Sequence, residues 1–93
     1  MTSYIYIADQ VLNECNKYVD KIVQVDHLDL TFSKEELNIA CSILRTYDLL
    51  IHESDGSGDF NKFKITITGQ AVANSSGGLR KYIDELGHQN NRN

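Results

Sequence analysis

Several features that mark large classes of proteins are scarce or absent in this sequence. Its 93 residues include no proline, no tryptophan and only two cysteines. No apolar run approaches the roughly 20 residues that a helix needs to cross a bilayer. Residues 1–4 lack the basic start and apolar stretch of a secretion signal. These absences predict a cytoplasmic protein that makes no membrane contact.

The few cysteines and histidines form no familiar metal-ligand pattern. Cys15 and Cys41 are not paired in a CxxC motif, and the spacing of Asp26, His27 and Asp29 matches no known ligand set. Both cysteines fall on apolar faces of predicted helices, so we expect buried free thiols, since a disulfide is unusual in a reducing compartment. We predict no metal site and no cofactor.

A basic excess is also missing. The chain carries 9 lysine and arginine residues against 13 aspartate and glutamate residues, a net charge of −4. Most of the acidic excess lies in residues 1–32. Because neutralisation of phosphates supplies much of the affinity of nucleic-acid-binding proteins, this balance weighs against nucleic-acid binding.

What the chain does contain is enough apolar sequence for one small core. Hydrophobic residues make up 41% and charged residues 24% of the sequence, which is ordinary for a globular domain. No internal repeat or long linker divides it, so we predict a single α+β domain over residues 1–93. A domain of this size gains stability when a second copy buries more apolar surface, which favours a homodimer.

Residues 4–23 predict an amphipathic helix, because apolar side chains recur at helical spacing with no glycine or proline among them. Residues 24–32 lose this period, and either a short strand or a single helical turn fits them. The apolar face of the predicted helix comprises Ile7, Ala8, Val11, Leu12, Cys15, Tyr18, Val19, Ile22 and Val23.

Ser33 and Glu36 have the spacing of a capping box and predict the start of a second helix. We expect this helix to end at Tyr47 or Leu49. Its wide apolar arc indicates packing on more than one side, and its opposite, polar stripe consists of Lys34, Asn38, Ser42 and Arg45.

A β-hairpin is expected next, with strands at residues 49–53 and 60–68 and a glycine-, serine- and aspartate-rich turn at 54–59. In the second strand Phe63, Ile65 and Ile67 alternate with polar residues.

Two short helices should complete the chain. Thr68 is expected to cap a helix over residues 69–74. A last helix over residues 79–86 should end at Gly87 as a left-handed cap, followed by a frayed tail at 88–93.

This order of elements resembles the winged helix-turn-helix superfamily. Residues 43–51 (ILRTYDLLI) are similar to the end of that family's recognition helix, and residues 67–71 (ITGQA) to the end of its second wing strand. Residues 76–82 (SGGLRKY) resemble the tail of many small bacterial winged-helix domains. The resemblance covers residues 4–86 and implies amphipathic helices packed with a β-hairpin wing and a helical tail. The sequence departs from the family at residues 24–32, where a separate helix is usual, and at Asp48, where glycine is usual.

The resemblance implies a transcriptional regulator that binds duplex DNA as a dimer through the recognition helix and the wing. Asparagine and arginine can read base edges, and lysines can contact phosphates. The residues expected at this interface are Lys34, Asn38, Ser42, Arg45, Asn61, Lys62 and Lys64. Since terminal helices of the family often dimerise, residues 4–7 (YIYI) with Tyr82, Ile83 and Leu86 are the expected dimer surface.

Carboxylates near the predicted recognition helix and near the wing support an alternative function. Glu35 and Glu36 stand at the start of the second helix, and Asp55 and Asp59 flank the wing tip, where they would repel phosphate. The alternative is a winged-helix module for protein interaction or dimerisation that does not bind DNA.

No local sequence pattern indicates a catalytic site. No residues point to a nucleophile with its base. Residues 54–59 lack the Lys-Ser/Thr ending of a phosphate-binding loop and the final glutamate of a calcium loop. We predict that the protein is not an enzyme and has no small-molecule ligand.

Overall fold

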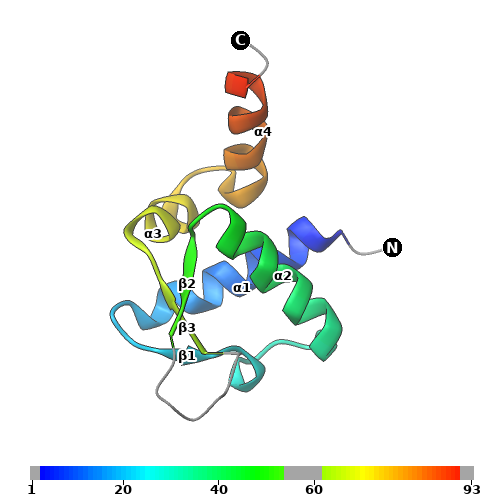
Figure 1. The fold of residues 1–93 in the computed structure, drawn as a ribbon, viewed down its shortest axis with the longest axis vertical. Helices are drawn as coiled ribbons and strands as arrows, with labels where there is room; N and C mark the ends of the chain where they lie inside the picture. The colour runs from blue at the N-terminus through cyan, green and yellow to red at the C-terminus, as the bar shows by residue number, and fades with distance from the viewer. Residues whose placement is uncertain (1–2, 54–61, 91–93) are drawn as a thin grey trace.

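The computed structural model describes residues 3–53 and 62–90. These residues form an α+β fold of four helices and a small three-stranded antiparallel sheet (Figure 1). With η denoting a 3-10 turn, the elements are α1 (Tyr4–Cys15), η1 (Asn16–Tyr18), β1 (Val23–Gln24), η2 (Val25–His27), α2 (Lys34–Thr46), β2 (Leu50–His52), β3 (Lys62–Ile65), α3 (Ile67–Asn74) and α4 (Gly78–Asn90).

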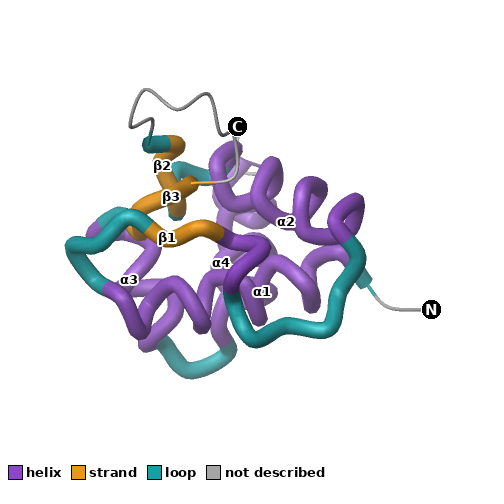
Figure 2. The backbone as a smooth tube through the Cα atoms, turned by 90° about the horizontal axis from the view of Figure 1, so that it is seen from below, coloured by secondary structure: helices purple, strands orange, loops and turns teal. Residues whose placement is uncertain are grey.

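β3 is the central strand of the sheet, with β1 at one edge and β2 at the other. β2 and β3 pair antiparallel as the sequence predicts, with Leu50 opposite Ile65 and His52 opposite Phe63. On the other side of β3, Val23 of β1 lies opposite Phe63. Figure 2 shows the three strands grouped beside the helices.

α1 and α2 pack against each other and form most of the core. Figure 1 shows α1 running behind α2 and the strands. The alternation of β3 directs Phe63 and Ile65 inward. The buried apolar side chains are Ile7, Ala8, Val11, Leu12, Cys15, Val23, Val25, Leu37, Ala40, Cys41, Leu44, Leu49, Leu50, Phe63, Ile65, Val72 and Leu79.

The capping box at the start of α2 is confirmed. The Ser33 hydroxyl accepts a hydrogen bond from the Glu36 N–H at 3.1 Å, and the Ser33 N–H donates to a Glu36 carboxylate oxygen at 3.0 Å. Two of the helix's unpaired N-terminal donors are satisfied in this way.

α2 ends one residue before the earlier of the two predicted ends. Asp48 adopts a left-handed conformation (φ +57°), which aspartate tolerates better than most residues. The Leu49 N–H then donates to the Leu44 carbonyl at 2.9 Å, which closes the helix. Asp48 therefore makes the turn that ends α2.

The prediction of one helix over residues 4–23 was wrong beyond Cys15. The chain passes through η1, turns at Asp20 in a left-handed conformation (φ +65°), and enters the sheet at Val23. Strand pairing of Val23 with Phe63 therefore replaces continued helix. As a result Tyr18, Val19 and Ile22, all expected in the core, are 44%, 37% and 52% exposed.

Residues 24–32 combine both structures that the sequence left open. Gln24 ends β1, and Val25–His27 form the single turn η2. This segment contains no helix longer than that single turn, as the loss of helical period indicated.

The second hairpin strand was predicted too long. β3 ends at Ile65, and Ile67 begins α3 with 85% of its surface exposed. Thr66, rather than Thr68, caps α3: its hydroxyl accepts from the Gly69 N–H at 2.9 Å. The same hydroxyl lies 2.7 Å from the Asp48 carbonyl, to which it donates, so a tertiary contact fixes the cap position.

The last helix was predicted too short. α4 runs from Gly78 to Asn90, and Gly87 lies within it rather than ending it. Glycine permits a left-handed cap but does not require one. Among the described residues the left-handed glycines are instead Gly77 and Gly78, which turn the chain from α3 into α4. Residues 91–93 of the expected frayed tail lie outside the described residues.

α4 is attached to the body mainly through its first turns and projects along the long axis of the molecule (Figure 1). The Leu79 N–H donates to the Asp9 carboxylate at 3.1 Å, so a side chain of α1 caps α4. Leu79 is fully buried. The Tyr82 ring lies edge-on to Tyr47, with 6.4 Å between centroids.

Within residues 3–53 and 62–90, none of the helices has the length and apolar character that crossing a bilayer requires.

Two glycine-to-alanine changes should shift stability in opposite directions. A Cβ at Gly69 would lie 2.2 Å from the Leu49 carbonyl oxygen, whereas one at Gly87 would meet nothing within 4 Å. We expect Gly69→Ala to lower the free energy of unfolding by about 1–3 kcal/mol. Gly87→Ala should leave it unchanged or raise it by up to about 1 kcal/mol. Urea unfolding followed by circular dichroism measures both, and a Gly69→Ala variant as stable as the parent would contradict the packing described here.

Candidate nucleic-acid interface

The polar stripe predicted on α2 is exposed along its whole length. Lys34, Asn38, Ser42 and Arg45 are all solvent-exposed, while Leu37, Ala40, Cys41 and Leu44 on the other side of the helix are buried. The separation follows from helical periodicity, since residues three, four, seven and eight apart share a face. The stripe thus forms one continuous surface.

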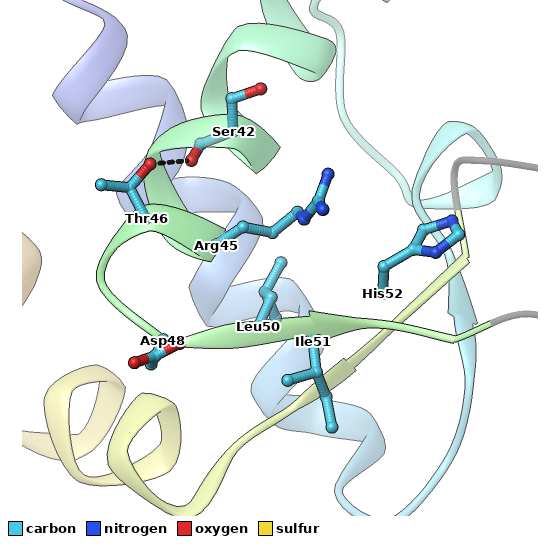
Figure 3. A pocket seen from close by; sticks show the side chains of 7 residues that line it. All are labelled: Ser42, Arg45, Thr46, Asp48, Leu50, Ile51 and His52. Carbon is cyan, nitrogen blue, oxygen red and sulfur yellow. Dashed lines mark hydrogen bonds between the residues drawn. The ribbon is translucent and has the colours of Figure 1, made fainter.

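The C-terminal half of the stripe opens into a groove between α2 and β2 (Figure 3). The groove has a volume of about 580 Å³. Its lining combines the end of α2, the turn after it and the whole of β2, namely Ser42, Arg45, Thr46, Asp48, Leu50, Ile51 and His52.

Local structure explains why these side chains meet. The left-handed turn at Asp48 reverses the chain directly after α2, so β2 returns beside the last turns of the helix. The Thr46 hydroxyl donates to the Ser42 carbonyl at 2.8 Å. The His52 ring lies edge-on to Phe63, with 5.5 Å between centroids, and this contact orients it.

The charge in the groove is mixed. Arg45 supplies a guanidinium, and in the described part of the chain it forms no ion pair. Asp48 supplies a carboxylate at the opposite end from His52 (Figure 3). An anion is therefore attracted to the end where Arg45 and His52 lie.

The structure separates the predicted interface residues into three groups. Ser42 and Arg45 line the groove. Lys34 and Asn38 lie at the other end of α2, where they line a cavity of about 20 Å³ with residues of η2 and β3. The third group comes from the hairpin: Lys62 and Lys64 are half-buried on β3, and Asn61 is outside the described residues.

Lys62 and Lys64 share the outer face of the sheet. Their neighbours Phe63 and Ile65 point into the core, so the alternation of the strand directs both lysines away from it. Neither lysine lines the groove of Arg45.

Sequence reasoning did not connect His52 with this surface. One signal was present: only residues 47–49 separate α2 from β2, so the strand must begin beside the helix end. That short connection brings the first residues of β2 to the C-terminal half of the polar stripe.

The two cysteines are buried free thiols, as predicted. Burial raises the pKa of Cys15 to about 12, with smaller contributions from the charges of Cys41 and Glu14. Burial likewise raises the pKa of Cys41 to about 12, although Arg45 acts in the opposite direction. Protonated thiols are poor nucleophiles. Among the described residues, no three His, Cys, Asp or Glu side chains come together to hold a metal ion.

Comparisons of this chain with protein-family models, with curated proteins and with solved structures gave no match.

The burial of both thiols should slow their reaction with a reagent in solution. At pH 8 we expect both to react more than about tenfold more slowly with a disulfide reagent in the folded protein than in urea. Because their folded pKa values are raised from 9.0 to about 12, their stabilising contribution is complete below pH 9 and is lost as the pH rises toward 12. Replacing both cysteines with alanine should remove this part of the pH dependence. Equal reactivity in both states would contradict the core assignment.

Proposed function

We propose that this domain binds duplex DNA in the manner of a winged-helix protein, with α2 in the major groove and the β2–β3 hairpin beside it. The observation that carries the proposal is the exposed polar stripe on α2, which leads from Lys34 to Arg45 and opens into a groove walled by β2. An exposed helix with asparagine and arginine on its outer face can read base edges.

The arrangement of elements supports the same proposal. α1 and α2 pack together, the β2–β3 hairpin follows α2, and β1 extends the sheet on the far side of β3. The turn η2 stands where a winged-helix protein has a separate helix. This difference shortens the helix-turn-helix element but leaves the outer face of α2 open. DNA binding agrees with the cytoplasmic location that the sequence predicts.

The mixed charge of the surface determines how the protein would bind. Lys34 and Arg45 attract phosphates, whereas Glu35 and Asp48 repel them. We therefore expect modest affinity that falls as salt is added.

The proposal is tested with two arginine variants that change the net charge equally. Arg45→Ala removes a cation from the groove, and Arg80→Ala removes one from the exposed side of α4. We expect Arg45→Ala to weaken binding to a duplex by about tenfold, while Arg80→Ala stays near the parent. Fluorescence anisotropy with fragments of the gene's own upstream region, at low salt, measures this. Absence of binding to any fragment at low salt, or an equal loss in both variants, would contradict the proposal.

A second candidate function is a protein-interaction module, and a different surface favours it. Tyr18 and Ile22, both exposed, border a groove of about 340 Å³ that Leu28 also lines. Val19, next to Tyr18, is exposed as well. Grouped exposed apolar side chains commonly mark interaction sites.

We also propose that the protein forms a homodimer, although part of the dimer surface expected at residues 4–7, Tyr82 and Ile83 packs against the core. Ile7 is fully buried, and Ile5, Tyr82 and Ile83 pack partly against the core, so they leave little for a partner. Tyr4 and Tyr6 are still 47% and 53% exposed.

Light scattering at micromolar concentration tests self-association and locates it. We expect a mass of two chains. Tyr4→Ser should restore the single-chain mass if the first turn of α1 forms the interface, and Ile22→Ser if the apolar groove does; both side chains are about half exposed, so neither change should unfold the domain. A single-chain mass for the parent protein would rule out the dimer at that concentration.

A further inference from the structure

We propose that the free edge of β1 binds an extended segment of a partner protein, which adds a fourth strand to the three-stranded sheet. This deepens the second candidate function, on which it rests, because it names the class of partner and the way in which the partner is held. The bound segment carries aliphatic side chains and at least one basic residue.

β1 lies at one edge of the sheet, with β3 between it and β2 (Figure 2). In an antiparallel ladder, successive residues of a strand direct their peptide groups to opposite sides. The Glu53 N–H donates to the Lys62 carbonyl at 2.9 Å, so the peptide groups of Lys62 point toward β2. Those of Phe63 therefore point toward β1, where Phe63 lies opposite Val23. Val23 is thus the residue of β1 whose peptide groups face β3.

The residues on either side of Val23 leave an open edge. Because peptide groups alternate along the chain, those of Ile22 and Gln24 point away from β3. In the part of the chain that the structure describes, no group bonds to the N–H or the carbonyl of Ile22, or to the N–H of Gln24. An incoming strand can pair with Ile22 through both of its groups and accept a further hydrogen bond from Gln24. Main-chain bonds of this kind supply affinity when a peptide adds to a sheet edge.

A groove along the same edge supplies contacts for side chains. The groove has a volume of about 340 Å³, and both residues of β1 line it together with Tyr18, Ile22 and Leu28. Tyr18 is 44% exposed and Ile22 is 52% exposed, so both side chains have apolar surface that a partner can cover. Aliphatic side chains of an added strand would remove this surface from water, which is favourable in proportion to the area. The groove and the open peptide groups therefore form one site.

The charge around the groove selects the partner. Asp20 and Asp29 directly adjoin lining residues in the sequence, are exposed, and form no ion pair within the described residues. Lys21 lines the groove and offsets part of this negative charge. A basic residue of the partner is therefore attracted to the site, whereas a phosphate is repelled. A second copy of the chain would bring four of these aspartates together, so a different protein fits the site better.

Two changes at position 24 separate strand pairing from side-chain contact. Gln24→Pro removes the outward N–H, whereas Gln24→Ala removes most of the side chain and keeps the N–H. Gln24 has φ −91° and ψ 109°, and its N–H makes no bond within the described fold, so an edge proline should be accepted there. We expect Gln24→Pro to weaken binding by at least about tenfold and Gln24→Ala by less than about twofold. Ile22→Ser, which removes an apolar contact, should weaken it by about five- to tenfold.

The probe is a peptide selected by the full chain from a randomised phage-displayed library of segments of about eight residues, a common strand length. We expect the selected peptides to alternate aliphatic residues with polar ones and to contain lysine or arginine. Amide hydrogen exchange followed by NMR locates the bound peptide. The amides of Ile22 and Gln24 should exchange freely in the free protein and become protected by the peptide, whereas the amide of Val23 should be protected in both states.

N-methylation of the peptide checks the pairing without any change to the protein. Methyl groups on one alternate set of its amides should abolish binding, and methyl groups on the other set should not, because only one set faces β1. Tolerance of both sets, together with full binding by Gln24→Pro, would overturn strand addition. If Ile22→Ser still weakened binding in that case, the interaction groove itself would stand.

Three further results would count against the proposal. Selection of no peptide that protects the amides of Ile22 and Gln24 would overturn it. Binding that Ile22→Ser, Gln24→Pro and Gln24→Ala all leave unchanged would overturn both strand addition and the interaction function of this groove. Protection of the same amides as the concentration of the protein alone is raised would assign the edge to a second copy of the chain and overturn the proposed partner.

Discussion

The hydrogen bonds around Leu49 join the helical and sheet parts of this domain. The Leu49 N–H donates to the Leu44 carbonyl at 2.9 Å, which ends α2. Its carbonyl accepts from the Thr66 N–H and the Thr66 hydroxyl, both at 3.1 Å, which ties the start of β2 to the end of β3. One buried residue therefore sets where the helix stops and where the hairpin begins.

The groove of Arg45 depends on this junction. If α2 ended a turn later, β2 would leave the helix at a different angle and its side chains would no longer face Arg45. Gly69 belongs to the same arrangement, because any larger residue there would push against the Leu49 carbonyl. The site is thus positioned by the core beneath it, although the side chains of the site are themselves at the surface.

Local patterns in the sequence predicted the parts of the structure that local forces decide. The capping box of Ser33 and Glu36 and the exposed stripe of α2 depend on residues within a few positions of one another, and both were predicted. The end of α1 was not, because residues 16–22 keep an apolar helical period. What overrides that period is pairing of Val23 with Phe63, forty residues away along the chain. That His52 lines the groove was not predicted for a similar reason, since only the folded chain shows that β2 lies along α2.

The capping of α4 by Asp9 also bears on the order in which the chain becomes structured. The Leu79 N–H and the Asp9 carboxylate are 70 residues apart in sequence, so this contact closes a long loop. Closing such a loop costs more chain entropy than closing a short one. α1 must already be in place to offer its carboxylate. We therefore expect α4 to dock late, onto a body already formed by α1, α2 and the sheet.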